Sequence, residues 1–167
     1  MQHYIMEDIM NTALNIFNRL ESKPFGRSLF SKILCIKAPY FGTIKPRFEE
    51  LKPGHCAISM KKRRAVTNHL GTVHAIAMAN LCELSGGTCI EVTLPGHLRW
   101  IAKSMDIEYL KIARTNLRSS CDIDVTKWEA GKDYPVTVHV IDKNDIEVVR
   151  AVITMYVSER KTGNVKG

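Results

Sequence analysis

The sequence predicts an α+β domain in which an antiparallel sheet of five to six strands wraps around a central helix. Nine of the twelve residues from Val73 to Leu84 are apolar, so a helix there has no face for solvent and must be enclosed by other structure. Several later segments alternate apolar and polar side chains with period two, which is typical of strands buried on one face. An enclosed helix and several half-buried strands can bury each other's apolar side chains if the sheet wraps around the helix.

The first part of the chain supplies helices and one strand. Residues 4–20 place Ile9, Ile16 and Leu20 at helical spacing with polar residues opposite, which predicts an amphipathic helix that docks on the fold. The segment 23–26 contains Pro and Gly and ends this helix. The elements expected next are a short helical turn or two over 27–34, an extended segment over 35–47, a turn at 52–54 and a strand over 55–61.

The central helix is expected over 72–85, with Gly86-Gly87 as its C-terminal stop. The strands expected after it cover 88–94, 105–109, 113–125, 136–140 and 149–157, with a hairpin turn at Asp142–Asp145. A chain of 167 residues is long enough for one substantial core. We therefore expect a single domain over 1–167, made of a helical extension (1–34), a core (35–158) and a polar tail (159–167).

Composition limits the class of protein. A net charge of +7 favours anionic partners. Five cysteines with no C-x-x-C pair argue against a metal or disulfide framework. No apolar run reaches the roughly 18 residues of a membrane span, and the first residues lack the pattern of a secretory signal. We expect a cytoplasmic protein with reduced thiols, no bound metal and no membrane partner.

A polar turn before the central helix and one carboxylate within that helix form the most informative motif. Asn68, Gly71 and His74 follow the pattern N-x-x-G-x-x-H, and Glu83 stands nine residues after the histidine. Because burying an unpaired charge is costly, a carboxylate amid alanines and leucines points to function. The motif resembles that of hotdog-fold acyl-CoA thioesterases, most closely the phenylacetate-pathway (PaaI-like) branch. The surrounding sequence is similar to a bacterial subgroup of hotdog proteins without assigned substrates.

This resemblance implies a hotdog core that hydrolyses an acyl-CoA thioester to a carboxylic acid and free coenzyme A. It implies that Glu83 acts as general base on water or as nucleophile. Backbone N–H groups near His74 and Ala75 would bind the oxyanion, because a helix start favours negative charge. Asn68 would orient the attacking water or the turn, and Gly71 completes the motif. The reaction implied needs no cofactor, since coenzyme A enters as part of the substrate.

The spacing of His74 and Glu83 predicts an oligomer. Nine helical residues advance about 13 Å and turn through about 900°, so on one helix the two side chains point away from each other. They can share a substrate only if two helices lie side by side. We therefore expect at least a homodimer, and the sequence leaves open whether dimers pair into tetramers. Ala75-Ile76 stand where the resembled branch usually has Gly-Gly, and Glu83 replaces its commoner Asp.

Each motif residue also has a purely structural interpretation. Asn68 and Gly71 could simply fix the turn, and His74 could pack with one backbone partner. Glu83 could pair with a cation across a subunit interface. Asn80, inside the apolar helix, is expected to hydrogen-bond a neighbour.

Four consecutive cations, Lys61, Lys62, Arg63 and Arg64, are the other candidate feature. A short run of this kind is usually a solvated strand end, although it could bind nucleic-acid phosphates. Few aromatic residues surround it, so we expect no nucleic-acid partner. In the hotdog interpretation, this run or Arg118 could contact the phosphates of coenzyme A.

Several functions therefore remain, with thioester hydrolysis first. The main alternative is a non-catalytic hotdog module that binds acyl-CoA or an acyl carrier. A hotdog dehydratase ranks third, because the catalytic pair it usually needs is not recognisable here. A basic nucleic-acid-binding protein ranks last.

Overall fold

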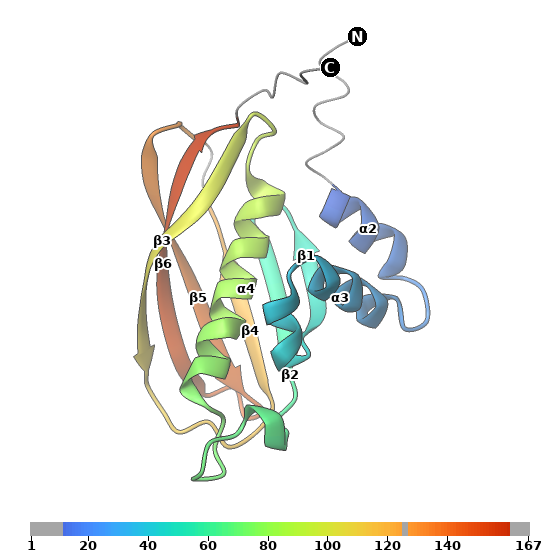
Figure 1. Ribbon diagram of the computed structural model, residues 1–167, viewed down its shortest axis with the longest axis vertical. Coiled ribbons are helices and arrows are strands. Elements are labelled where there is room, and N and C mark those ends of the chain that lie inside the picture. The colour runs from blue at the N-terminus through green and yellow to red at the C-terminus, as the bar shows by residue number, and fades with distance from the viewer. Residues whose placement is uncertain (1–11, 125–126, 161–167) are drawn as a thin grey trace.

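A computed structural model describes residues 12–124 and 127–160, and in this part of the chain six antiparallel strands curve around one long helix (Figure 1). The sheet has the order β1-β2-β4-β5-β6-β3. The helical elements are α2 (Thr12–Leu20), α3 (Gly26–Lys37), the 3-10 helices η1 (Pro39–Ile44) and η2 (Arg64–Val66), and α4 (Ala75–Thr93). The strands are β1 (Arg47–Lys52), β2 (His55–Met60), β3 (Leu98–Tyr109), β4 (Leu117–Asp122), β5 (Lys132–Asp142) and β6 (Glu147–Glu159).

The predicted fold class is confirmed, and so are most of the strands. Those expected at 55–61, 105–109, 113–125, 136–140 and 149–157 are β2, β3, β4, β5 and β6. The hairpin turn is also where it was expected, since Asp142 N–H donates to the carbonyl of Ile146 at 2.9 Å. The start of the first predicted helix (4–11) and the end of the polar tail lie outside the described residues.

The predicted end of the central helix is wrong. Helix α4 continues through Gly86 and Gly87 to Thr93, so the strand expected at 88–94 is its last two turns. The glycines allow close packing rather than ending the helix. A Cβ on Gly86 would lie 2.9 Å from Cδ1 of Ile153, and one on Gly87 would lie 2.9 Å from Cη2 of Trp100.

A side chain at Gly86 should therefore destabilise the protein. Gly86→Val is expected to lower the free energy of unfolding by about 1–3 kcal/mol, because the added carbons force β5 and β6 away from α4. Gly86→Ala should cost less, since alanine regains about 1 kcal/mol of helix propensity over glycine. Urea denaturation of the three proteins measures both differences. A more stable valine variant would contradict this account of the close approach.

One further prediction of the first half is wrong, and strand β1 is not among the predicted elements. Residues 35–47 are not extended: α3 runs to Lys37 and η1 follows, with Pro39 in its first turn, where its fixed φ is tolerated. Strand β1 carries no clear period of two, because its register with β2 shifts between Phe48 and Glu50. Because of that irregularity, the apolar residues of β1 do not alternate in the way that predicts a strand.

The helices α2 and α3 are anchored to β1 by aromatic contacts. Phe30 packs edge to face on Phe17 and on Phe48, with ring centroids 5.1 and 5.0 Å apart. Ser31 Oγ accepts the N–H of Phe48 at 3.0 Å and donates to the carbonyl of Arg27 at 2.8 Å. These contacts hold α3 and η1 beside the central helix, where they form one wall of the site described below.

Part of α4 is covered neither by α3 and η1 nor by the sheet. Strand β3 is the last strand of the sheet and bonds only to β6 among the described residues. Ile153 and Met155 of β6 are fully buried, whereas their partners on β3, Met105 and Ala102, are half-buried and exposed. Ile76 on α4 is 58% exposed. An exposed part of α4 and an unpaired strand edge are therefore both accessible. No helix of the described residues is long and apolar enough to cross a membrane.

Candidate active site

The loop before α4 is fixed by Asn68. Its Oδ1 accepts the N–H groups of Leu70 and Thr72 at 3.0 and 3.1 Å, and its Nδ2 donates to Thr72 Oγ1 at 2.8 Å. Gly71 has a φ of +72°, a conformation that residues with side chains rarely adopt. Asn68 and Gly71 therefore fix the conformation of the turn that precedes α4.

His74 caps α4, and its bonds fix the state of its ring. Nδ1 accepts the N–H of Ile76 at 3.1 Å, so a neutral imidazole carries its proton on Nε2. The backbone N–H of His74 donates to the carbonyl of Val66 at 2.8 Å. His74 thus offers a hydrogen-bond donor, Nε2–H, at the helix start.

The N–H of Ala75 is the other donor at this end of the helix. It makes no hydrogen bond with any described residue, whereas the N–H groups of Ala77 and Met78 both donate to the carbonyl of His74. Tyr109 Oη donates to the carbonyl of Ala75 at 3.2 Å. Partial burial and the nearby Cys82 raise the pKa of Tyr109, so the phenol stays protonated.

Glu83 lies on α4, and its side chain is exposed in the single chain. It makes no ion pair with a described residue. Ile76, Asn80, Glu83 and Gly87 follow one another at four, three and four residues, which places them along one face of the helix.

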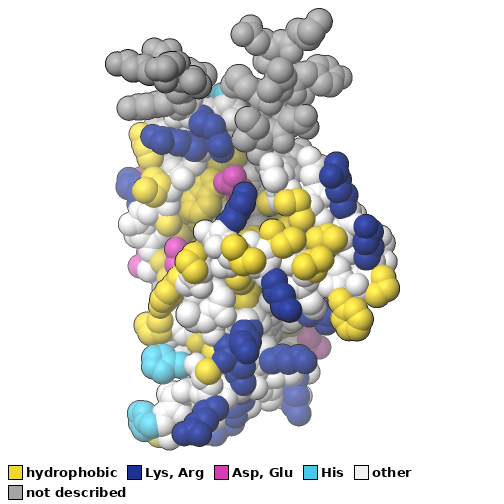
Figure 2. Space-filling model, turned by 45° about the vertical axis from the view of Figure 1, so that its right-hand side comes forward, with side chains coloured by type: hydrophobic (Ala, Val, Ile, Leu, Met, Phe, Trp, Pro, Cys, Tyr) yellow, Lys and Arg dark blue, Asp and Glu magenta, His cyan; other side chains and the backbone are white. Residues whose placement is uncertain are grey.

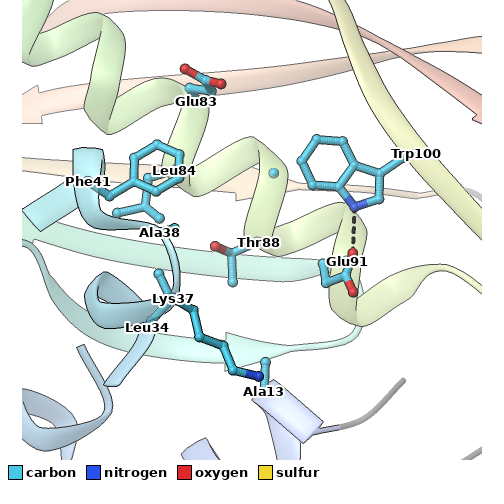
Figure 3. Close-up of a pocket in the computed structure, with 11 residues that line it drawn as sticks. Ala13, Leu34, Lys37, Ala38, Phe41, Glu83, Leu84, Thr88, Glu91 and Trp100 are labelled. Carbon is cyan, nitrogen blue, oxygen red and sulfur yellow. Dashed lines mark hydrogen bonds between the residues drawn. The ribbon is translucent and has the colours of Figure 1, made fainter. Parts of the chain in front are cut away.

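An apolar groove of about 350 Å³ begins at Glu83 and follows α4 toward its C-terminus (Figure 3). Helix residues Leu84, Gly87 and Thr88 line one side, and Leu34, Ala38 and Phe41 of the α3–η1 segment line another. Trp100 of β3 and Glu91 also line it, joined by a 2.6 Å hydrogen bond from Nε1 to Oε2.

A second hollow, the polar pocket, lies along the same helix face on the other side of Glu83. It has about 190 Å³ and is lined by His74, Ile76 and Asn80 of the helix region, together with Tyr40 and Thr43 of η1. Because η1 also contributes Phe41 to the apolar groove, one short element covers both hollows.

Cys82, the neighbour of Glu83, is not a candidate nucleophile. It is fully buried, and burial raises the pKa of its thiol to about 12. The reactive thiolate is therefore absent near neutral pH. Among the residues that the structure describes, no three His, Cys, Asp or Glu side chains are grouped as metal ligands would be.

The predicted cations fall into two groups. Lys and Arg side chains gather over the lower end of the molecule, where η2 and the loop before α4 lie (Figures 1 and 2). Arg63, in this region, donates through Nη2 to the carbonyl of Thr43, beside the polar pocket. Arg118 is on the far face of the sheet: its neighbour Ser119 bonds Ser85 of α4, and Arg118 pairs with Glu50 at 2.7 Å. The sheet therefore separates Arg118 from the helix.

The structure brings some of the predicted site residues together in one chain and separates others. Asn68, Gly71, His74 and Ala75 form the turn and helix start. Glu83 and His74 line different hollows along α4. Local patterns do not indicate the η1 residues, because only the tertiary fold places η1 beside α4, and they do not indicate Glu91, because its segment is expected to be a strand.

Comparison with known proteins defines the class. The chain superposes with a TM-score of 0.72 on a Pseudomonas aeruginosa protein of unknown function described as a probable thioesterase, at 20% identity over 83% of this chain and 97% of that one. A Haemophilus influenzae thioesterase superposes with a TM-score of 0.68, at 12% identity over 82% of this chain and 93% of that one. The sheet, the central helix and these neighbours identify a hotdog fold, which confirms the fold that the resemblance implies.

Within that class, the chain belongs to the family of the domain of unknown function DUF4442, whose model matches residues 26–157. A crystal structure named genomics APC5556 is 38% identical, with a TM-score of 0.77 over 93% of this chain and 99% of that one. No curated protein matches the chain.

Proposed function

We propose that the protein is a thioesterase that hydrolyses acyl-CoA to a carboxylic acid and coenzyme A. The observation that carries the proposal is the Glu83 carboxylate, which pairs with no cation of the described residues and lies at the mouth of an apolar groove of a size to hold an acyl chain. The names of the two hotdog neighbours, a thioesterase and a probable thioesterase, agree with this chemistry.

The proposed reaction uses Glu83 as a general base. Its carboxylate takes a proton from water while the water oxygen bonds to the thioester carbon, and the carbonyl oxygen becomes an oxyanion. The C–S bond then breaks, and the proton on Glu83 passes to the departing sulfur to give free coenzyme A. Attack by the carboxylate itself, through an acyl anhydride that water then hydrolyses, gives the same products. Neither route uses a metal or redox cofactor.

The oxyanion requires hydrogen-bond donors. The donors at the start of α4 do not line the groove of Glu83 in the same chain. Ala75 N–H and His74 Nε2–H are suitable, because both are donors at the positive end of α4. We therefore propose a homodimer in which the α4 helices lie side by side and each site combines Glu83 with the helix start of the partner. The uncovered face of α4 and the unpaired edge of β3 offer the surface for it.

The dimer is tested at Ile76. Aspartate there is harmless to an isolated chain, because the side chain is 58% exposed and an acid is favoured in the first helical turn. Buried against a partner, it would be costly. Ile76→Asp is expected to change the mass in sedimentation from twice 18.9 kDa to 18.9 kDa. Ile36→Asp, at an isoleucine 79% exposed on α3, is the control. Equal masses for Ile76→Asp and wild type would contradict this interface.

The activity is tested by thiol release from acyl-CoA thioesters that range from acetyl to palmitoyl and include phenylacetyl. We expect steady release from at least one member and a release at least about 10²-fold slower in Glu83→Gln. Saturable binding of every member without release would instead indicate a non-catalytic acyl-CoA module and overturn the proposal.

A further inference from the structure

A further hollow of about 310 Å³, the distal hollow, adjoins the apolar groove at the end away from Glu83. The residues that line both hollows are Ala13, Leu34, Lys37 and Glu91. In Figure 3 this shared wall lies at the far end of the groove from Glu83. The two hollows therefore extend one another, from Glu83 along α4 to the helices α2 and α3.

The distal hollow presents apolar side chains from both of these helices. The residues that line it alone are Thr12 and Ile16 of α2 and Phe30 and Ile33 of α3. Ile16 and Ile33 are half-buried, so part of their apolar surface is open in the single chain. An alkyl chain that covered this surface would be bound by the hydrophobic effect.

Two charged residues stand at the junction of the hollows, and both leave it open. Oε2 of Glu91 accepts the Nε1–H of Trp100 at 2.6 Å, which holds the carboxylate toward β3. Lys37 lies on the α3 side of the groove, where its methylene groups add apolar surface (Figure 3). No ion pair of the described residues joins Lys37 to Glu91 across the junction.

The length of the groove sets how much of an acyl chain it can hold. Glu83 and Glu91 are eight residues apart on α4, which is about 12 Å along the helix. Bonded carbons are about 1.5 Å apart and follow a zigzag, so an extended alkyl chain advances about 1.3 Å per carbon. Roughly nine or ten carbons therefore reach from a thioester at Glu83 to the junction. The tail of a longer chain would continue into the distal hollow.

We propose that the preferred substrates carry unbranched acyl chains longer than about ten carbons, with the tail in the distal hollow. The inference rests on the proposed function and names the acyl class on which that site acts. Binding of the tail is non-covalent. Ile16 and Ile33 determine the accepted length, because they line the distal hollow and not the groove beside Glu83.

The dependence of kcat/KM on chain length tests the proposal. Decanoyl-CoA and hexadecanoyl-CoA are compared below the concentrations at which they form micelles. Wild type is expected to favour hexadecanoyl-CoA by at least about tenfold, since each fully buried methylene group is worth up to about fourfold and the distal hollow is partly open.

Two variants fill the distal hollow from different helices. Ile33→Trp on α3 and Ile16→Trp on α2 should each reduce the preference to about twofold or less and leave kcat/KM for decanoyl-CoA near that of wild type. The unchanged rate on the shorter substrate also reports that the variant is folded. Ile36→Trp is the matched control, because Ile36 on α3 is 79% exposed and lines neither hollow. Its preference should equal that of wild type.

Binding of the product acids measures the tail site without hydrolysis. Calorimetry should show that wild type binds hexadecanoate at least about tenfold more tightly than decanoate, and that Ile33→Trp loses this difference. If wild type shows this binding but hydrolyses no acyl-CoA, the proposed function fails and the tail site stands.

The opposite outcome is equally distinct. If wild type hydrolyses both acyl-CoA substrates with equal kcat/KM, the distal hollow takes no part of the substrate. If both tryptophan variants fold and keep the wild-type preference, the tail lies elsewhere. In either case hydrolysis stands and the tail site is contradicted.

Discussion

Glu83→Gln is expected to lower kcat by about 10²- to 10⁴-fold and to change KM little. Glutamine keeps the size of the side chain but cannot take a proton from water, so binding survives and chemistry does not. The loss falls on kcat because Glu83 lies at the mouth of the apolar groove and does not fill it. Steady-state thiol release with a single acyl-CoA measures both constants.

A carboxylate that lines neither the apolar groove nor the polar pocket provides the control. Glu129→Gln removes an equal charge from an exposed ion pair with Lys132, whose contribution to stability is small. Its kcat should equal that of wild type. Equal activity of Glu83→Gln and Glu129→Gln would remove Glu83 from the mechanism.

Ala75→Pro is expected to lower kcat by about 10²- to 10³-fold, as the loss of an oxyanion donor does in other hydrolases. The substitution deletes the one N–H at the helix start that bonds to no described residue. Proline is well tolerated as the first residue of a helix. His74, which precedes it, already has φ −69° and ψ 138°, the extended conformation that a following proline requires.

The helix should therefore survive in this variant while the donor is lost. Circular dichroism and the melting temperature check the fold, and Ala75→Ser, which retains the N–H, is the matched control. A folded Ala75→Pro protein with wild-type kcat would exclude this amide from the oxyanion site.

Local patterns predict much of the fold, and the exceptions have tertiary causes. The later strands alternate cleanly because α4 covers one face of each, as at Ile153 and Met155. Gly86-Gly87 suggests a helix stop in isolation, yet these glycines are needed because Ile153 and Trp100 pack directly on the helix. No local pattern can show that requirement. The irregular register at Phe48 similarly conceals β1.

The residues of the candidate site likewise fall into those that local spacing indicates and those that only the tertiary fold brings together. Asn68, Gly71, His74 and Glu83 can be found from spacing, because the turn and the helix are continuous in sequence. Asn80 could be noticed only as a polar residue in an apolar helix. The hydrogen bond expected of it goes from Nδ2 to Oγ1 of Thr43 on η1, which lies 37 residues earlier in the chain. The groove wall formed by Trp100 and Glu91 likewise depends on how β3 meets α4.

The shared site is tested most directly by mixing two inactive proteins. Glu83→Gln and Ala75→Pro chains are unfolded together and refolded in equal amounts, so that about half of the dimers contain one chain of each kind. In such a dimer one site combines both substitutions, and the other site has neither. The account predicts recovery of about a quarter of wild-type thiol release, since one site in four is intact. If each site is built within one chain, the mixture stays as inactive as its components, and that result would contradict the account.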